Sequence, residues 1–408
     1  MTAPWTPMRW PAAWTDSSAL ELIKGSAIDY LWIDKGEQFE SVRTQARQAG
    51  LRIGVADEAP SGVMLVKGQW PGVRAARSDA GRVTAGPTGD PWVDSNGWQI
   101  RLAAALHPQT AVWVNAPPPQ NLRASAGAYL IAVADSGAYG GRWVISLDTQ
   151  LAAGLAARRP DALEIWKKTA EAAGFFAQHK AWAGYSPAAV VGVISDFAGD
   201  NEAFSRELLN LLARAGQHYR ILPKDAVPDL EGLRAVIYPD AQQPGANLRK
   251  QILGFVEAGG ALIASPSWGA APGAAAKLDD EGPLFVARSL GKGRIALAKT
   301  PARDPYQWAN DSVVLVSHRY DMVRIWNGGS TGSYYALSPD RKKAVVHVMF
   351  YANRGPDAAS VRIAGRWKAA KAWTPDGPVE RIESEYNQDA IEVHLPQVPQ
   401  YVALELDA

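Results

Sequence analysis

The chain has 408 residues, of which 47% are hydrophobic and 20% are charged, and its formal net charge is +1. This composition is typical of a globular protein with two or three domains, and it excludes a largely disordered chain. A near-neutral charge creates no field that would gather nucleic acid or an anionic membrane. We therefore expect neither as a partner.

The sequence contains no cysteine. Disulfides, thiolate metal sites and cysteine nucleophiles are therefore excluded. The six histidines are scattered, with no pair at the i, i+4 spacing that places two ligands on one helix face. We predict no metal site and no cofactor.

The N-terminal segment 1–10 has neither the basic start nor the continuous apolar run of a signal peptide. No apolar run approaches the roughly 20 residues that a membrane-spanning helix needs. The compartment stays open. We expect a periplasmic or extracellular protein if a signal peptide has been removed, and a cytoplasmic one otherwise.

Strands alternate with helices over residues 1–184. A predicted strand at 27–34, a helix at 37–49 and a strand at 51–57 establish the rhythm, which indicates a parallel sheet. The same alternation continues in predicted strands at 62–66, 82–85, 111–115 and 142–148 and predicted helices at 96–106 and 124–135. These strands are too few for an eight-fold barrel. We predict a reduced (β/α) barrel-like domain, with a small open sheet as the alternative.

A long helix predicted at 161–179 leads to a second α/β domain over residues 185–304. Its buried strand at 188–196, helix at 202–215 and later strands follow a doubly wound, flavodoxin-like pattern. Residues 283–299 are predicted to form a hairpin that turns at Gly291–Gly293. Short strands between turn signals over residues 320–408 predict a C-terminal antiparallel β-sandwich. The fold class is therefore α/β and multidomain.

Three local segments carry a resemblance to a known group of enzymes: Gly259–Ile263, Gly291–Ile295 and Tyr334–Asp340. Together with the order of domains, they resemble family 42 β-galactosidases and related glycoside hydrolases. The resemblance implies a catalytic barrel, a glutamine-amidotransferase-like trimerisation domain and a small β domain. It also implies a carbohydrate substrate and a homo-oligomer. The first domain is shorter than that family's barrel and lacks a clean Asn-Glu pair after a strand.

The middle domain is predicted to lack glutaminase activity, because an active enzyme of that fold needs a cysteine nucleophile and none is present. Ser267 is a poor substitute. The segment Ser265–Gly269 lacks the first glycine of a nucleophile elbow, so we interpret it as an ordinary loop.

Acidic residues gather where the strands of the first domain are predicted to end, which is the catalytic face of a parallel barrel. Glycoside cleavage needs two carboxyl groups, one acid and one nucleophile or base. The predicted catalytic residues are Asp57, Glu58, Asp94 and Asp148. The predicted substrate-binding residues are Asp34, Asp90, Trp92, Trp98 and Trp113.

Each of these residues also has a structural interpretation. Asp94 and Asp148 precede predicted helices and are suited to cap them. Asp34 is placed to form an ion pair with Lys35 or Arg142. The sequence has 16 tryptophans, whose rings either stack on sugars or fill the core.

The sequence thus supports two hypotheses. The first is a glycoside hydrolase with a two-carboxylate acid/base mechanism. The alternative is a non-catalytic carbohydrate-binding or assembly protein that keeps the glycosidase architecture.

Overall fold

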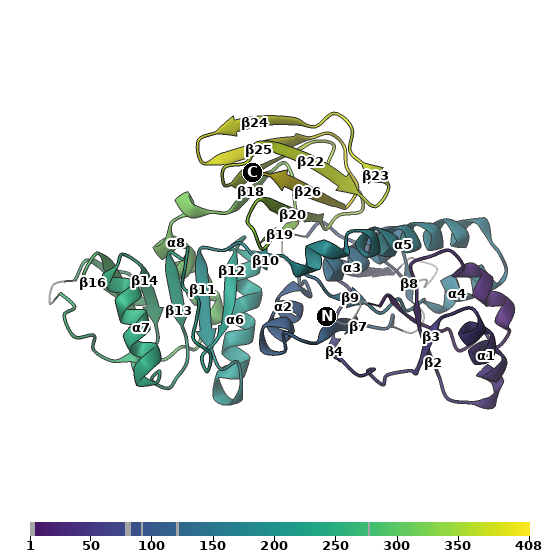
Figure 1. Ribbon diagram of the computed structural model, residues 1–408, viewed down its shortest axis with the longest axis horizontal. Coiled ribbons are helices and arrows are strands. Elements are labelled where there is room, and N and C mark those ends of the chain that lie inside the picture. The colour runs from purple at the N-terminus through teal and green to yellow at the C-terminus, as the bar shows by residue number, and fades with distance from the viewer. Residues whose placement is uncertain (1–4, 78–82, 91–92, 120–121, 276–277) are drawn as a thin grey trace. The chain divides into compact units, whose positions relative to one another are not determined.

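The computed structural model describes residues 5–77, 83–90, 93–119, 122–275 and 278–408. The chain forms two compact units (Figure 1). Unit 1 comprises Met1–Tyr185 and Ile325–Ala408, and unit 2 comprises Ser186–Arg324. Strands β10 (Ser186–Pro187) and β18 (Val323–Trp326) lie where the chain passes from one unit to the other.

Unit 1 begins with two parallel sheets of three strands each, in the orders β1-β2-β3 and β4-β7-β9. Their strands are β1 (Pro7–Arg9), β2 (Tyr30–Ile33), β3 (Arg52–Val55), β4 (Val63–Lys67), β7 (Ala111–Asn115) and β9 (Arg142–Trp143). A parallel bridge between Met8 and Ile145 joins the two sheets. The segment that begins at β9 therefore lies between β7 and β1. In the described residues no strand pairing joins β3 to β4, so closure into a barrel stays a prediction.

Side chains alternate across these strands, as the pleat of a β-strand requires. Tyr30 and Trp32 of β2 belong to a small cluster with Trp113 and Val144. Leu31, on the opposite face, belongs to the main core of the unit. Both faces of β2 are thus buried, which explains the run of apolar residues in this strand.

The helices of this part pack on the face of the sheets that carries Leu31, where the main core lies. They are α1 (Glu40–Gln48), α2 (Gly97–Leu106), α3 (Ala126–Ala138), α4 (Thr149–Ala156) and α5 (Pro160–Gln178), with short 3-10 turns η1 (Ser17–Leu22), η2 (Glu37–Phe39) and η3 (Lys180–Gly184). The predicted strand–helix alternation is confirmed. The strand predicted at 142–148 is shorter, because residues beyond β9 keep only the Met8–Ile145 bridge. A further small sheet contains β5 (Val73–Arg77), β6 (Val83–Pro87) and β8 (Leu122–Ala124). Of these three strands, only β6 was predicted.

The C-terminal part of unit 1 consists of antiparallel strands, as predicted. One sheet contains β19 (Thr331–Leu337), β20 (Lys343–Phe350), β26 (Tyr401–Asp407), β22 (Ala369–Thr374) and β23 (Gly377–Pro378), and the other contains β21 (Ala359–Ala364), β25 (Ala390–Leu395) and β24 (Glu383–Asn387). Val345 and Met349 of β20 and Tyr401 of β26 share the core cluster that contains α3 and α5. The two chain segments of unit 1 are therefore held by one continuous core.

Unit 2 is built on a seven-stranded sheet in the order β12-β11-β13-β14-β17-β16-β15. The strands are β11 (Val191–Ser195), β12 (Tyr219–Pro223), β13 (Ala235–Tyr238), β14 (Ala261–Ala264), β15 (Asp280–Glu281), β16 (Phe285–Leu290) and β17 (Gly293–Ala298). The helical elements are α6 (Glu202–Arg214), α7 (Ala246–Glu257) and α8 (Pro305–Val316), with the 3-10 turns η4 (Gly199–Asn201), η5 (Pro266–Trp268) and η6 (His318–Tyr320). The first five strands of the order are parallel, and the chain reverses direction across the sheet between β11 and β13.

The predicted hairpin at 283–299 is confirmed as the antiparallel pair β16–β17. Its turn requires glycine. Gly291 has φ +58° and a Cβ there would lie 2.7 Å from the Glu257 backbone, at the end of α7. A Cβ on Gly293 would overlap the carbonyl oxygens of Val256 and Gly260. These glycines let the hairpin turn pack directly on the end of a helix.

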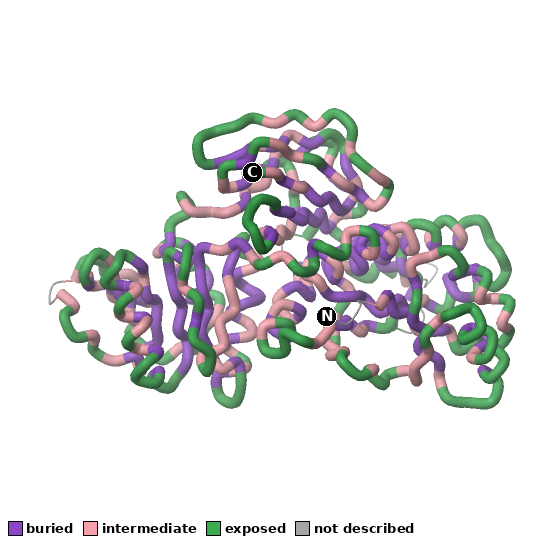
Figure 2. The backbone as a smooth tube through the Cα atoms, viewed as in Figure 1, coloured by how far each residue is buried: buried purple, intermediate pink, exposed green. Residues whose placement is uncertain are grey.

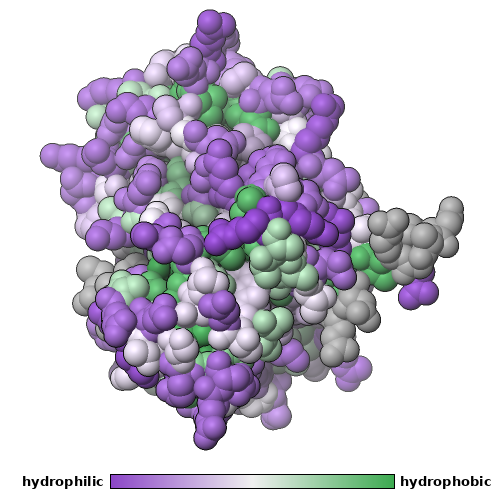
Figure 3. Space-filling model, turned by 90° about the vertical axis from the view of Figure 1, so that its right-hand side faces the viewer, coloured by the Kyte–Doolittle hydropathy of each residue, from purple (hydrophilic) through white to green (hydrophobic). Residues whose placement is uncertain are grey.

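Burial follows the strands of both units and helix α3, and exposure is concentrated in the loops (Figure 2). On the face drawn in Figure 3, hydrophilic residues predominate, with apolar residues in smaller patches among them. No helix in the described ranges is long and apolar enough to span a membrane.

One buried carboxyl group links α3 to the C-terminal strands. Asp135 is fully buried and accepts hydrogen bonds from the Asn96 backbone N–H at 2.9 Å and its side-chain amide at 3.1 Å. The Tyr351 hydroxyl donates to its other oxygen at 2.9 Å. Burial raises the pKa of Asp135 to about 6, against the lowering effect of these hydrogen bonds.

This carboxyl group makes stability depend on pH. Because the pKa is higher in the folded than in the unfolded chain, folding binds a proton between about pH 4 and about pH 6. The free energy of unfolding should therefore fall as pH rises through that window, by roughly 3 kcal/mol in all. We expect Asp135→Asn to abolish most of this decrease, because an amide fits the same partners without a charge. Chemical unfolding at several pH values measures it. The exposed Asp161→Asn is the control, and a parallel decrease in all three proteins would contradict the assignment.

Candidate functional site

Three polar side chains meet at the carboxyl end of the parallel strands in unit 1. Arg9 is the last residue of β1, Asn115 is the last residue of β7, and Asp57 follows β3. The Arg9 guanidinium forms an ion pair with the Asp57 carboxylate, and the Asn115 amide donates to Asp57 Oδ1 at 3.2 Å. We call these three residues the strand-end cluster. It gathers residues that are 48 and 106 positions from Arg9 in the sequence.

Two polar atoms of the strand-end cluster form no hydrogen bond within the described residues. Within the described part of the chain, Arg9 Nε and Asn115 Oδ1 are buried without a hydrogen-bond partner. Buried polar atoms usually have partners, so such atoms indicate a place where a ligand or water binds. Asp57 also has φ +64°, a left-handed conformation that is uncommon outside glycine and often occurs at functional sites.

Glu58 lies beside the cluster. Its carboxylate forms an ion pair with Lys35 at 3.1 Å, and its backbone carbonyl accepts a hydrogen bond from the Trp32 indole at 3.1 Å. The side chains of Asp57 and Glu58 are 61% and 62% exposed. The general acid of a glycosidase is typically a carboxyl in an apolar pocket, and neither residue has that environment.

Asp148 is used in the structure itself. It is buried and is the N-cap of α4, where one carboxylate oxygen accepts from the Gln150 and Leu151 backbone N–H groups at 3.0 and 2.9 Å. The other oxygen accepts from the Ala124 backbone and the Tyr129 hydroxyl, both at 3.1 Å. The capping interpretation is therefore confirmed, and the geometry does not bring Asp148 to the strand-end cluster.

The other predicted acids are dispersed. Asp34 is half-buried after β2, and its backbone carbonyl accepts a hydrogen bond from Arg43. Asp90 is exposed and forms a long ion pair with Arg74 at 3.6 Å. Asp94 is half-buried ahead of α2, whose N-cap is Asn96, so the prediction that Asp94 caps this helix is wrong.

The tryptophans predicted to bind a sugar have different environments in the structure. Trp113 is fully buried, with its ring centroid 4.9 Å from that of Tyr30 and 5.6 Å from that of Trp32. Its ring faces are therefore covered by protein and not open to a sugar. Trp98 is half-buried on α2. Trp92 lies outside the described residues.

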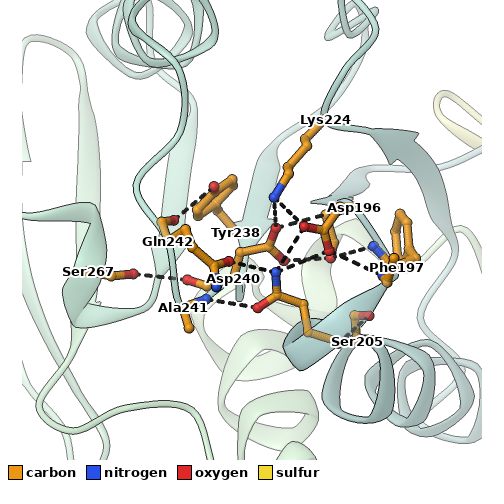
Figure 4. Close-up of polar contacts among 12 residues, drawn as sticks. Asp196, Phe197, Ser205, Lys224, Tyr238, Asp240, Ala241, Gln242 and Ser267 are labelled. Carbon is orange, nitrogen blue, oxygen red and sulfur yellow. Dashed lines mark hydrogen bonds and ion pairs between the residues drawn. The ribbon is translucent and has the colours of Figure 1, made fainter.

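A second polar cluster, missed by the sequence analysis, occupies the carboxyl ends of the adjacent strands β12, β11 and β13 in unit 2. Lys224, Asp196 and Asp240 follow these strands and point toward one another (Figure 4). Lys224 Nζ forms ion pairs with Asp196 and with Asp240, the latter at 3.1 Å. The Ser195 hydroxyl donates to Asp240 at 2.5 Å. The signal was available, since each residue lies at or just after the end of a predicted strand.

Charge pairing controls the protonation of this second cluster. Partial burial lowers the pKa of Lys224, but hydrogen bonds with Asp196 and Asp240 outweigh it and raise that pKa to about 12. Burial raises the pKa of Asp240, and this exceeds the opposite effect of Ser195 and Lys224. Lys224 therefore stays a cation and is unsuited to act as a general base.

Ser267 does not form a nucleophilic site. Its hydroxyl donates to the Asp240 backbone carbonyl at 2.9 Å and lies 2.5 Å from the Ser265 hydroxyl, within the 3-10 turn η5. In the described residues, no group of three or more acidic or histidine side chains is placed to hold a metal ion.

No family model and no curated protein matches the sequence. Among solved structures, the chain is similar to α-L-fucosidase isoenzyme 2 from Paenibacillus thiaminolyticus, with a TM-score of 0.51, 12% identity, and coverage of 95% of this chain and 79% of that chain. A rhamnosidase from Novosphingobium sp. PP1Y matches with a TM-score of 0.49 at 11% identity, covering 91% of this chain and 38% of that one. The β-galactosidase from Bacillus circulans sp. alkalophilus matches with a TM-score of 0.48 at 10% identity, covering 91% and 66%. The chain thus has a mixed α/β fold like that of a glycoside hydrolase.

The contrast between two predicted acids gives a test of these assignments. We expect Asp148→Ala to lower the free energy of unfolding by about 2–4 kcal/mol, because it removes a helix cap and leaves buried donors unpaired. Asp57→Ala, which removes an exposed ion-pair partner, should cost less than about 1 kcal/mol. Urea unfolding of the two variants measures both. Equal losses would contradict the division between a structural carboxylate and an exposed one.

Proposed function

We propose that this protein binds carbohydrate at the strand-end cluster of unit 1. The observation that carries the proposal is the meeting of Arg9, Asp57 and Asn115 at the carboxyl ends of parallel strands. Ligands of parallel α/β folds bind at that end of the sheet. The fold shared with a fucosidase supports sugar as the ligand class.

The chemistry of the cluster suits a neutral, hydroxyl-rich ligand. A sugar hydroxyl both donates and accepts, and the cluster offers a guanidinium donor, a carboxylate acceptor and an amide that does both. The Arg9–Asp57 pair cancels its own charge, so it provides oriented partners without attracting ions. A net charge of +1 gives the whole chain no preference for a polyanionic sugar.

Hydrolysis of a glycosidic bond is the second candidate. It is favoured by the adjacent acids Asp57 and Glu58 at the end of β3, combined with the glycosidase-like fold. In this scheme Asp57 serves as nucleophile or base, and Glu58 or Asp94 serves as acid. Binding ranks first because both carboxylates of the adjacent pair are exposed and ion-paired, rather than one being held in an apolar pocket.

The family-level part of the proposal concerns unit 2. The parallel order of its sheet supports a relationship to the amidotransferase-like trimerisation domain of family 42 β-galactosidases and related glycosidases. A chain without cysteine retains no glutaminase nucleophile of that type, so this unit is proposed to serve assembly.

Sugar binding is tested with the methyl glycosides of galactose, fucose and rhamnose. We expect Asn115→Ala to weaken the binding of the preferred glycoside about 10-fold in calorimetric titration, because one or two hydrogen bonds are lost. The exposed Asp161→Asn should leave it unchanged. Unchanged affinity in Asn115→Ala would remove the cluster from the site.

The same proteins decide between binding and catalysis. The matching nitrophenyl glycosides report hydrolysis directly. If the protein hydrolyses one of these substrates and Asp57→Asn abolishes the hydrolysis, catalysis replaces binding as the favoured function. Binding without turnover supports recognition alone.

Assembly is tested by mass. We expect light scattering to give a multiple of the 43.8 kDa chain mass. Support comes from α8, on which Val314 is 71% exposed and Tyr306 is 46% exposed. Val314→Asp should reduce the mass, whereas Val227→Asp, at a loop position that is 87% exposed, should not. A mass of one chain in the parent protein would contradict the proposal.

A further inference from the structure

Unit 2 contains a cavity of about 210 Å³ at the carboxyl ends of its parallel strands. Its walls come from the segments after β11, β13, β14 and β17, and they include Phe204 of α6 together with Pro239, Ser267 and Pro301. The sheet reverses its winding between β11 and β13, and such a switch point is where doubly wound folds bind ligands. The cavity therefore has the position of a binding site, and it lies within one unit of the chain.

The walls combine an apolar side with polar groups. Phe204 is half-buried, and its ring is fixed edge-on against Trp308 at 5.5 Å between centroids. The prolines that line the cavity, Pro239, Pro266 and Pro301, extend the apolar wall. A rigid aromatic and proline surface suits the C–H face of a ring.

The polar groups are mainly hydrogen-bond acceptors. The Ser265 and Ser267 hydroxyls lie 2.5 and 2.9 Å from the Asp240 carbonyl oxygen and 2.5 Å from each other, so both protons bond within this group. Their protons are thereby engaged, which leaves oxygen lone pairs to accept from a ligand. Asp200 is exposed on the cavity wall, and the described residues provide no ion-pair partner for it.

The Lys224–Asp196–Asp240 cluster holds this wall in place. Asp240 is 1% exposed, and its side chain is fixed by Lys224 and Ser195 while its carbonyl receives the two serines. Asn201, which lines the cavity, donates to Asp196 at 3.0 Å and to Gln242 at 2.8 Å. Preorganised walls lower the entropic cost of binding a small ligand.

Other ligand classes fit less well. No lysine or arginine lines the cavity, and Asp200 would repel a phosphate, which argues against nucleotides and phosphosugars. The volume is below the roughly 300–1,000 Å³ of pockets for drug-sized ligands. The lining therefore favours a ligand that is small, not anionic and rich in hydrogen-bond donors, with one apolar face.

We propose that this cavity binds a single neutral sugar ring, at a site separate from the strand-end cluster of unit 1. Ring hydroxyls donate to Ser267 and Asp200, and the apolar face of the ring lies on Phe204. The inference does not depend on sugar binding at the strand-end cluster, because its residues belong to the other unit.

The experiment uses the whole chain, labelled for amide NMR, with the methyl glycosides of galactose, fucose and rhamnose as probes. We expect one of them to shift the amide signals of Ser267 and Ala241. Phe204→Ala should weaken that binding about 10-fold and Ser267→Ala about 5-fold. Asn115→Ala should leave it unchanged, which separates this site from the strand-end cluster.

A second variant keeps the test decisive if Phe204→Ala unfolds the unit. Ala302→Phe fills the cavity from a loop and should abolish the shifts while preserving the rest of the spectrum. The proposal is overturned if no glycoside shifts these amides at 50-fold the concentration of protein or above. It is equally overturned if inorganic phosphate or ethanolamine shifts them instead, or if Ala302→Phe has no effect.

Discussion

The arrangement of unit 1 depends on aromatic packing between two parallel sheets that, in the described part of the chain, share one backbone bridge. Met8 and Ile145 provide that bridge, and a single bridge adds little rigidity. Tyr30 and Trp32 of β2 instead pack edge-on against Trp113 of β7, with ring centroids 4.9 and 5.6 Å from it. Each buried aromatic side chain contributes far more than one hydrogen bond. Because this packing holds the side chains of β2 against Trp113 of β7, it also brings the ends of β1, β3 and β7 together.

The acidic residues illustrate how environment decides the role of one residue type. Asp148 and Asp135 are both buried, but the first accepts four hydrogen bonds at a helix start and the second accepts three beside Tyr351. Both carboxylates therefore have structural roles, because their oxygens are occupied by hydrogen bonds within the protein. Asp57, at the carboxyl end of the parallel strands, has an exposed carboxylate. Residue type and proximity to a strand end in the sequence do not distinguish these cases, since only the three-dimensional neighbours supply or withhold the donors.

Local patterns predicted much of the secondary structure. The apolar runs of β2, β11 and β13 and the glycine pair around the β16–β17 turn were sufficient signals, because burial on both faces and positive φ impose residue types directly. Strands β1 and β8 have three residues each, too few for a period to be recognised. The location of Asp57 after a strand was predictable for the same local reason. Its partner Arg9 was not, because pairing of β1 with the segment after β9 is a long-range event with no local signature. The 16 tryptophans were ambiguous for a similar reason, since the same side chain serves a core and a sugar platform.

A common design connects the polar clusters of the two units. In each, a carboxylate at the end of a parallel strand is paired with a cation from the end of another strand, Asp57 with Arg9 in unit 1 and Asp240 with Lys224 in unit 2. In unit 1 the pair is one-to-one, whereas in unit 2 Lys224 faces two carboxylates, Asp196 and Asp240. In both clusters the pairing holds oxygen lone pairs in fixed directions. Oxygen lone pairs held in fixed directions are well suited to accept hydrogen bonds from hydroxyl groups. The geometry of both clusters is therefore consistent with the proposed binding of hydroxyl-rich ligands, and the glycosidase-like fold is compatible with binding or catalysis.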